Sequence, residues 1–107
     1  MIRVVEYLDA AGRSPFGDWF DGLDVQAAMK VRRSVARMEF GNFGDAKPIG
    51  KGVIERRIDF GPGYRIYFGR DGDELVILLA GGTKKRQQKD IETAQSYWAD
   101  YKGRKKG

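Results

Sequence analysis

Hydrophobic positions in the first forty residues follow a strand pattern and then a helical one. Residues 2–8 are mainly β-branched and aromatic and end at Ala-Ala-Gly, which predicts a short first strand. Ser14 before Pro15 is typical of a helix start, and hydrophobic residues then recur at helical spacing at Phe16, Trp19, Phe20 and Leu23. After Asp24 we expect a second helix, which has one apolar face and a basic face of Lys30, Arg33 and Arg37.

In the second half of the chain hydrophobic residues recur at every second position, which is typical of strands. Residues 41–52 are rich in glycine and contain Pro48, so they predict a loop. Strands are expected at residues 53–60, 64–70 and 75–80, joined by Gly-Pro-Gly and Asp-Gly-Asp-Glu turns as an antiparallel meander. The segment 75–80 is apolar throughout, which indicates a central strand.

The chain is expected to end in a helix, because hydrophobic residues return to helical spacing at Ile91, Ala94, Trp98 and Tyr101. The order βααβββα predicts an α+β fold and a single domain over residues 1–107, with a basic tail at 102–107.

Alternation along the strands assigns their side chains to two faces. Ile54, Ile58 and Phe60 share one face with Ile66 and Phe68 of the next strand. If the helices cover that face, the open face carries Arg57, Arg65 and Tyr67. Arg56 has the parity of the core-facing residues, so we expect it at the sheet edge with its charged group in solvent.

The positive charge is concentrated in the second half of the chain. The net charge is +5, but residues 1–46 hold six basic and seven acidic residues, whereas residues 47–107 hold fourteen and eight. Such an asymmetry attracts polyanions, so nucleic acid or an acidic protein is the expected class of partner.

Composition excludes several classes of enzyme. The chain contains no cysteine and no histidine, which rules out Ser-His-Asp and Cys-His hydrolases and disfavours most transition-metal sites. The longest strictly apolar run, Leu75–Ala80, is too short to span a membrane, and the N-terminus lacks the pattern of a secretory signal. We therefore expect a cytoplasmic protein with no membrane partner.

Basic and phenolic residues gather in GVIERRIDFGPGYRIYF and in GGTKKRQQKDI one strand later. Arginines at 57 and 65 can hold a phosphate, and Tyr64 or Tyr67 can stack on a base. Gly81 and Gly82 would allow a close approach of backbone, for example to a phosphate. The alternative is that the charged strand residues only solubilise the sheet and pair with Glu55 and Asp59.

These blocks, together with SPFGDWFDGL, resemble the RelE/ParE superfamily of toxins from type II toxin–antitoxin systems, in particular its HigB-like branch of addiction-module killer proteins. The resemblance covers nearly the whole chain. It implies a curved antiparallel sheet, an endoribonuclease activity on mRNA that is often ribosome-associated, no metal or organic cofactor, and a cognate antitoxin as partner.

The resemblance also implies roles for individual residues. Arg65 matches the arginine of a Tyr-Arg motif, Arg57 the basic residue of the preceding strand, and Lys84 a basic residue after the last strand. Further residues expected to contact RNA are Lys47, Arg56, Tyr64, Lys85, Arg86 and Gln87. The chain departs from the branch at Thr83, where aspartate is common, and at Arg56, where an apolar residue is usual.

Chemistry without histidine or metal can use the RNA 2′-hydroxyl as nucleophile, leaving a 2′,3′-cyclic or 3′-phosphate. Arg65 and Arg57 are then expected to hold the phosphate, and Lys84, Lys47 and Tyr67 are candidates to move protons. Two alternatives remain open: a ParE-like inhibitor of DNA gyrase, and an RNA-binding module without catalysis.

Overall fold

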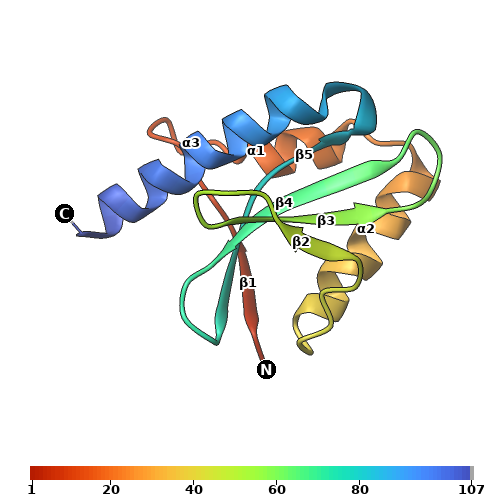
Figure 1. Ribbon diagram of the computed structural model, residues 1–107. Helices are drawn as coiled ribbons and strands as arrows, with labels where there is room; N and C mark the ends of the chain where they lie inside the picture. Colours follow the sequence, from red (N-terminus) through yellow and green to blue (C-terminus); the bar gives the residue numbers. More distant parts are fainter. Residues whose placement is uncertain (107) are drawn as a thin grey trace.

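A five-stranded sheet lies between helices in the computed structural model, which describes residues 1–106 (Figure 1). The elements are β1 (Arg3–Glu6), α1 (Pro15–Asp21), α2 (Val25–Met38), β2 (Ala46–Pro48), β3 (Val53–Ile58), β4 (Tyr64–Arg70), β5 (Leu75–Thr83), the 3₁₀ helix η1 (Lys84–Arg86) and α3 (Gln87–Lys106). The strand order is β1-β5-β4-β3-β2. Strands β2 to β5 pair antiparallel, and β1 joins β5 in parallel.

The α+β class is confirmed, but the predicted number of strands is wrong. The segment expected to be a loop contains β2, which pairs with β3 at the sheet edge. This strand has only three residues and includes Pro48, so it shows no alternating pattern, and proline is tolerated there because an edge strand has one unpaired side. The predicted basic tail is also wrong in part, because α3 continues through Lys106; residue 107 lies outside the described residues.

Both predicted helix starts are confirmed by their caps. The Ser14 side chain accepts a hydrogen bond from the backbone N–H of Gly17, and the Asp24 side chain accepts one from Ala27, both at 2.9 Å. These bonds satisfy N–H groups that have no partner within the helix. Among residues 1–106, no helix is long and apolar enough to cross a membrane.

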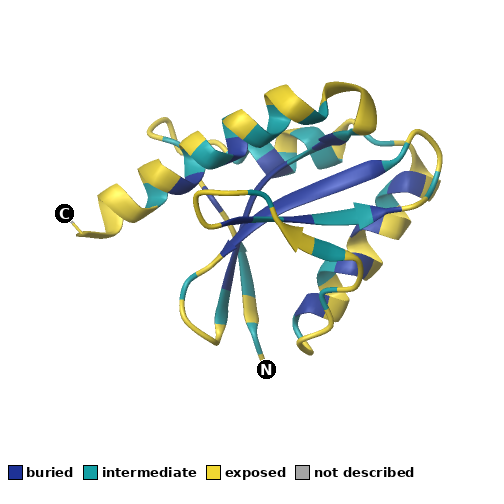
Figure 2. Cartoon of the chain, viewed as in Figure 1, coloured by how far each residue is buried: buried dark blue, intermediate teal, exposed yellow. Residues whose placement is uncertain are grey.

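The sheet carries a hydrophobic core on each face (Figure 2). One core lies under α1 and α2 and is built from Phe16, Val31, Met38, Ile66, Phe68 and Leu78, among others. The other lies under α3 and includes Val53, Tyr67, Ile77, Leu79, Ala94 and Trp98. Strand β5, central as predicted, supplies residues to both cores.

The second core means that no face of the sheet is fully open. Helix α3 crosses the face that the alternation left uncovered (Figure 1), and Tyr67 beneath it is fully buried. The predicted exposure of Tyr67 is therefore wrong. The end of this face nearest Arg57 and Arg65 leads to a groove.

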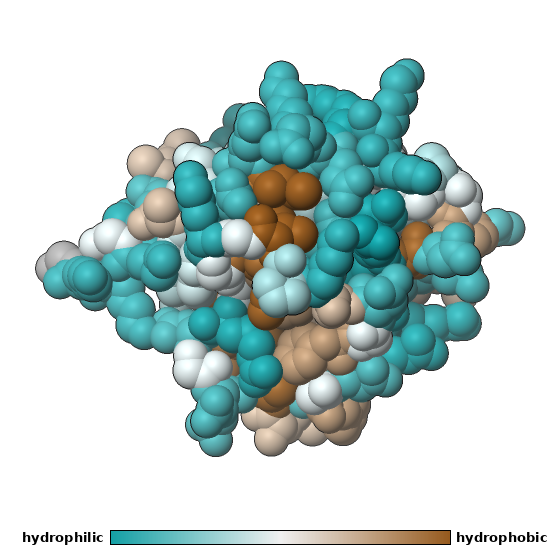
Figure 3. Space-filling model, in the orientation of Figure 1, coloured by the Kyte–Doolittle hydropathy of each residue, from teal (hydrophilic) through white to brown (hydrophobic). Residues whose placement is uncertain are grey.

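The molecular surface is mostly polar. On the side shown in Figure 3, hydrophilic residues surround a narrow strip of hydrophobic ones. The large hydrophobic residues that are clearly exposed are Met1, Leu8, Val25, Met29 and Phe40.

Candidate active site

A buried carboxylate organises the positive charges on the α3 side of the sheet. Glu55 on β3 is completely buried. Its Oε1 accepts a hydrogen bond from Arg57 Nε at 3.1 Å and lies 4.0 Å from Arg65 Nε, and its Oε2 accepts a bond from Gln87 Nε2 at 2.8 Å. One carboxylate thus connects β3, β4 and the first residue of α3.

Register explains why these side chains meet. Arg57 pairs with Arg65 across β3 and β4, and residues directly opposite each other share a face. Glu55 lies two positions before Arg57 and therefore shares that face too. Gln87 reaches the carboxylate because α3 begins directly after η1, over the same part of the sheet.

Arg65 is held almost out of solvent. Its side chain is only 9% exposed, its Nη1 donates to the Tyr64 carbonyl at 3.3 Å, and its Nε has no hydrogen-bond partner within residues 1–106. Because this Nε is covered by protein and lies beside Glu55, a ligand in the groove would contact the outer nitrogens of the guanidinium. Arg57 is more accessible, with 37% of its side chain exposed.

Lys84 joins the arginines at a groove of about 410 Å³. The groove is lined by Asp45, Arg57, Asp59, Gly61, Pro62, Gly63, Arg65 and Lys84. The Lys84 N–H donates to the Gly63 carbonyl at 2.9 Å, which ties η1 to the turn between β3 and β4. Gly63 has a φ of +81°, and a Cβ there would lie 3.3 Å from Arg65 Nη1 and 3.6 Å from Lys84 Cβ. Both basic side chains therefore pack against this glycine.

The charges around Glu55 keep it ionised. Burial acts to raise the pKa of Glu55, but hydrogen bonds from Gln87 and Arg57 and the charge of Arg65 outweigh it, so the pKa lies below its ordinary value of 4.5. Its oxygens are occupied by these donors. Glu55 therefore positions the arginines and does not face the groove as a base.

Tyr67 has the opposite electrostatic setting. Burial, and then the negative charge of Glu55 opposite it across the strands, raise the pKa of Tyr67 above its ordinary value of 10. Its hydroxyl forms no hydrogen bond of ordinary geometry within residues 1–106. A phenol that is buried and protonated at neutral pH is not an accessible base.

Two further residues that were predicted to contact RNA make contacts within the protein instead. Tyr64 is 8% exposed and packs its ring between Phe60 and Trp19, with ring centroids 6.4 Å away in each case. The expectation of an exposed ring at position 64 is wrong, because Tyr64 has the parity of the apolar residues Ile66 and Phe68. The amide nitrogen of Gln87 is bonded to Glu55, as described above.

The glycines before η1 also serve packing. A Cβ at Gly81 would collide with the Trp19 ring, and one at Gly82 with the Asp90 carboxylate. Gly81 and Gly82 belong to β5, which continues to Thr83. The close approach predicted there is that of two side chains of the protein itself, and the expected phosphate contact is not supported.

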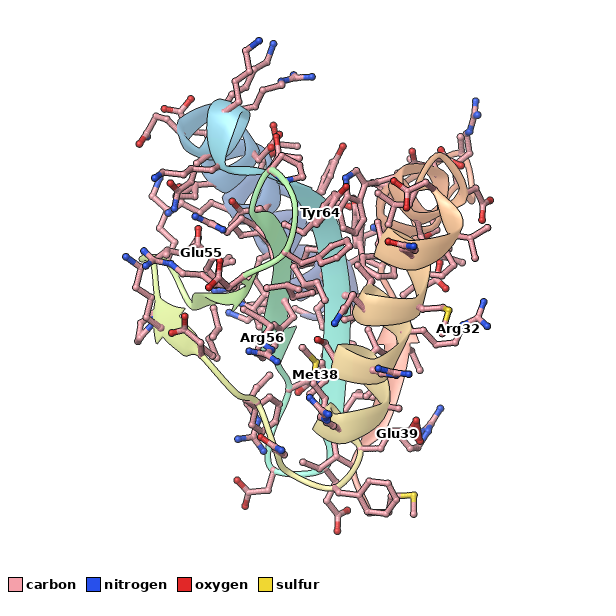
Figure 4. All side chains as sticks on the ribbon, turned by 90° about the vertical axis from the view of Figure 1, so that its right-hand side faces the viewer. Arg32, Met38, Glu39, Glu55, Arg56 and Tyr64 are labelled. Atoms are coloured by element: carbon pink, nitrogen blue, oxygen red, sulfur yellow. The ribbon has the colours of Figure 1, made fainter. Side chains whose placement is uncertain are left out.

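The remaining predicted residues lie around the groove or on its far side. Lys47 is exposed on β2, opposite Glu55 in the strand register, and Lys85 and Arg86 are exposed on η1. None of the three lines the groove. Arg56 lies on the other side of β3, facing α2, so the prediction of a solvent-exposed edge position is wrong (Figure 4).

Sequence reasoning missed Glu55 as an organising residue and treated it only as a possible ion-pair partner. The available signal was its parity, because Glu55 alternates with Arg57 and shares its face. Asp59, which lines the groove, was likewise treated only as a possible ion-pair partner, and Asp45, which also lines it, was missed. Within residues 1–106, His, Cys, Asp and Glu side chains form no group of three that could hold a metal ion.

The groove can bind an anion and stabilise charge on it. Three cationic side chains converge there, and one of them is nearly buried, where electrostatic interactions are stronger than in water. Guanidinium groups suit phosphate because they offer several donors in a fixed plane.

The chain is similar to one family of known proteins and to one bacterial relative. Residues 18–98 match the family described as "Phage derived protein Gp49-like (DUF891)". A protein of Haemophilus influenzae, described as uncharacterized, is 44% identical over 81 residues, which are 75% of this chain and 82% of that protein. The matched range begins within α1 and ends at Trp98, so it includes every residue that lines the groove.

Proposed function

Because the chain belongs to the phage-derived Gp49-like family, a family of RelE/HigB-type toxins, we propose that it is the toxin of a type II toxin–antitoxin system and cleaves mRNA. The proposal places it in the HigB-like branch and makes it an endoribonuclease that inhibits translation and growth. The observation that carries it is the groove in which a nearly buried Arg65 converges with Arg57 and Lys84.

The first step of the proposed reaction is attack by an RNA 2′-oxygen on the adjacent phosphorus. The new P–O bond forms as the bond to the 5′-oxygen of the next nucleotide breaks, which gives a 2′,3′-cyclic phosphate and a free 5′-hydroxyl. Negative charge grows on the non-bridging oxygens, and Arg65 would stabilise it with the outer nitrogens of its guanidinium. Arg57 holds the same phosphate from the more open side.

Two proton transfers accompany this step. The 2′-hydroxyl must lose a proton, and the leaving 5′-oxygen must gain one. Lys84 is exposed, lines the groove and is the side chain best placed to deliver a proton. Lys47 stays a second candidate for proton transfer, whereas buried Tyr67 belongs to the scaffold.

Glu55 supports the reaction through the arginines. Its carboxylate fixes Arg57 at 3.1 Å and lies beside Arg65, so the guanidinium groups are oriented before substrate arrives. Preorganised charge is effective in catalysis because no reorganisation is needed during the reaction. Glu55 is a positioning residue in this proposal.

The proposed partners follow from the same surface. Exposed Lys47, Lys85 and Arg86 surround the groove and add long-range attraction for mRNA and for ribosomal RNA. A cognate antitoxin with an acidic segment would neutralise this surface, and the toxin would act in the cytoplasm.

The test uses purified protein with mRNA on translating ribosomes and with the same mRNA free in solution. New RNA ends are mapped for the wild type, for Arg65→Ala and for Arg70→Ala. Arg70 lies at the opposite end of β4 and is exposed, so it controls for loss of one arginine from the same strand. We expect site-specific cuts that Arg65→Ala reduces by about a hundredfold or more.

The two substrates also decide whether the ribosome is required. Cuts on both mRNAs would show an independent nuclease, and cuts only on translated mRNA would show ribosome dependence. Absence of cuts from protein that still arrests growth would contradict the proposal and favour inhibition of DNA gyrase. Equal cutting by wild type and Arg65→Ala would remove Arg65 from the site.

A further inference from the structure

A second basic groove lies between α2 and β3. It has a volume of about 270 Å³ and is lined by Lys30, Arg33, Ser34, Arg37, Asp45, Arg56, Arg57, Ile58, Asp59 and Phe60. Five of these residues are basic and two are acidic. We call it the Arg56 groove, after the guanidinium that projects from β3 toward α2 (Figure 4).

Arg56 is an arginine at a position where the strand alternation calls for a core residue. Its neighbours of the same parity, Ile54 and Ile58, pack with the core under α1 and α2. Its Nη1 donates to the Arg57 carbonyl at 3.0 Å, and its Nη2 lies 3.4 Å from the Ser34 hydroxyl. Gly44, with a φ of +60°, gives it room, because a Cβ there would collide with the guanidinium.

Three of the five basic residues in this groove, Arg33, Arg37 and Arg56, are not neutralised by close contacts within residues 1–106. Within residues 1–106, no carboxylate lies at ion-pair distance from Arg33, Arg37 or Arg56. Burial lowers the pKa of Arg56; the charge of Asp45 opposes this effect and the charge of Arg37 adds to it. A half-buried Arg56 with the exposed Arg33 and Arg37 beside it favours the binding of an anion.

The Arg56 groove continues into the groove of Arg65. Both are lined by Arg57 on β3, by Asp45 just before β2 and by Asp59 just after β3, so the two depressions adjoin at this end of the strand. Together they are lined by seven basic and two acidic residues. An extended polyanion that lies in one can therefore reach the other past Arg57, with the carboxylates of Asp45 and Asp59 beside its path.

An aromatic side chain adds a feature that suits single-stranded RNA. The half-buried Phe60 ring lines the Arg56 groove, and Lys30 Nζ lies 5.3 Å from its centroid. Grooves that follow a nucleic-acid backbone with cations commonly present aromatic faces to the bases.

We propose that the Arg56 groove binds the backbone phosphates of single-stranded RNA next to the phosphate held by Arg57 and Arg65. This inference rests on the proposed function for the position of the scissile phosphate. It extends the RNA site over the α2 side of the sheet, where Arg33, Arg37 and Arg56 contact RNA that flanks the cut.

The experiment measures RNA binding separately from cleavage. Labelled 2′-O-methyl RNA is used because its blocked 2′-oxygen cannot attack the phosphorus. One oligonucleotide is long enough to fill both grooves, and a shorter one fills a single groove. Affinity and its salt dependence are measured for the wild type, Arg37→Gln and Arg56→Gln.

Arg32→Gln is the matched control. Arg32 lies on α2 as Arg37 does and is exposed, but it points away from the Arg56 groove (Figure 4) and packs over Phe20 instead. The substitution removes the same charge from the same helix. Its effect on RNA binding therefore measures the contribution of net charge alone.

We expect Arg56→Gln to weaken binding of the long RNA about tenfold, as for a lost hydrogen bond to a charged group. Because Arg37 is exposed, Arg37→Gln should weaken binding of the long RNA about threefold. Each should reduce the slope of log affinity against log salt by about 0.7. Arg32→Gln should do neither, and the losses should be smaller with the short RNA.

Each outcome separates this inference from the proposed function. Equal affinities for Arg37→Gln and Arg32→Gln, from a protein that cleaves RNA, would overturn the inference and leave the nuclease intact. If Arg37→Gln loses RNA binding but the wild type cuts no RNA, the proposed nuclease activity is wrong and the proposed RNA binding by the Arg56 groove stands. If these substitutions weaken binding of an acidic peptide but not of RNA, the groove is a protein-binding surface and the inference is wrong. Because Arg37 is exposed, its variant tests the groove even if Arg56→Gln fails to fold.

Discussion

Arg56 and Arg57 are neighbours in the sequence but have opposite surroundings. Arg57 lies on the α3 side of β3, where it shares the buried Glu55 carboxylate with Arg65. Arg56 lies on the α2 side, where its nearest partners are a carbonyl and a hydroxyl. Figure 4 shows Glu55 and Arg56 on opposite sides of the strand.

This difference separates two uses of positive charge in one strand. A guanidinium paired with a buried carboxylate is fixed in place before any ligand binds, which suits a group that must stabilise a transition state. A guanidinium bonded to neutral oxygens keeps its charge available to an incoming anion. We therefore expect the α3 side to depend on Glu55 for its structure, and the α2 side to depend little on Arg56.

The largest expected effect is that of Glu55→Gln. The substitution leaves Arg65 and Arg57 without their carboxylate, and breaking a buried ion pair by removal of one partner typically costs about 3 kcal/mol. We expect a loss of about this size in the free energy of unfolding, measured by urea denaturation. RNA cleavage should fall as well, because the arginines lose their orientation.

Asp59→Asn is a suitable control for this measurement. Asp59 lines the same groove but is exposed, so its stability should change by about 0.5 kcal/mol or less. A Glu55→Gln variant as stable as Asp59→Asn would show that the buried carboxylate does not hold the site together.

The stability difference between the wild type and Glu55→Gln should depend on pH. The pKa of Glu55 is lower in the folded protein than its ordinary value of 4.5, so the ionised form stabilises the fold. This contribution is fully present above about pH 4.5 and is lost as the pH falls through the folded-state pKa. The stability gap between wild type and Glu55→Gln should therefore narrow below pH 4.5.

Urea denaturation of both proteins over a series of pH values checks this expectation. Other acidic groups titrate in the same range, but they are common to both proteins and cancel in the difference. A gap that stays constant down to the acid transition would mean that Glu55 has the same pKa in the folded and unfolded states.

Much of the fold could be predicted because local rules decide it. Ser14 with Pro15, and Asp24, start helices by capping chemistry that depends only on neighbouring residues. The strand predicted at residues 64–70 has the observed bounds of β4. What local rules miss is β2, whose three residues form a strand only because β3 offers them an edge.

The sequence predicted which face of the sheet the site residues share, but not that a helix covers that face. Alternation placed Arg57 and Arg65 on one face, and the register pairs them. It could not show that α3 folds back over that face, because helix docking depends on contacts distant in sequence, such as Trp98 in the second core. Tyr67 is buried for this reason, and Glu55 became a central residue instead of a surface ion-pair partner.

A smaller effect is expected from Arg56→Met. The substitution removes two hydrogen bonds to neutral groups but also removes a half-buried charge that has no carboxylate at ion-pair distance in the described chain. These effects oppose each other, so stability should change by about 1 kcal/mol or less. Inorganic phosphate should raise the melting temperature of the wild type more than that of Arg56→Met.

Arg57→Met serves as the comparison on the other face of the strand. It should be more destabilising than Arg56→Met, because it leaves the buried Glu55 carboxylate with one donor fewer. If Arg56→Met proved as destabilising as Glu55→Gln, Arg56 would be a structural residue and the contrast between the two sides of β3 would fail.

The smallest effect is expected from Tyr67→Phe. Its hydroxyl has no hydrogen-bond partner of ordinary geometry within the described residues, so its removal should change stability by about 0.5 kcal/mol or less. Burial and the charge of Glu55 raise the pKa of Tyr67, which keeps the phenol protonated at neutral pH. We therefore expect RNA cleavage within about threefold of the wild type, whereas loss of a general base typically costs about a hundredfold or more. A cleavage assay at neutral pH distinguishes the two. A hundredfold loss in a fully folded Tyr67→Phe protein would return Tyr67 to the reaction, and would mean that the α3 side of the sheet opens during catalysis to expose it.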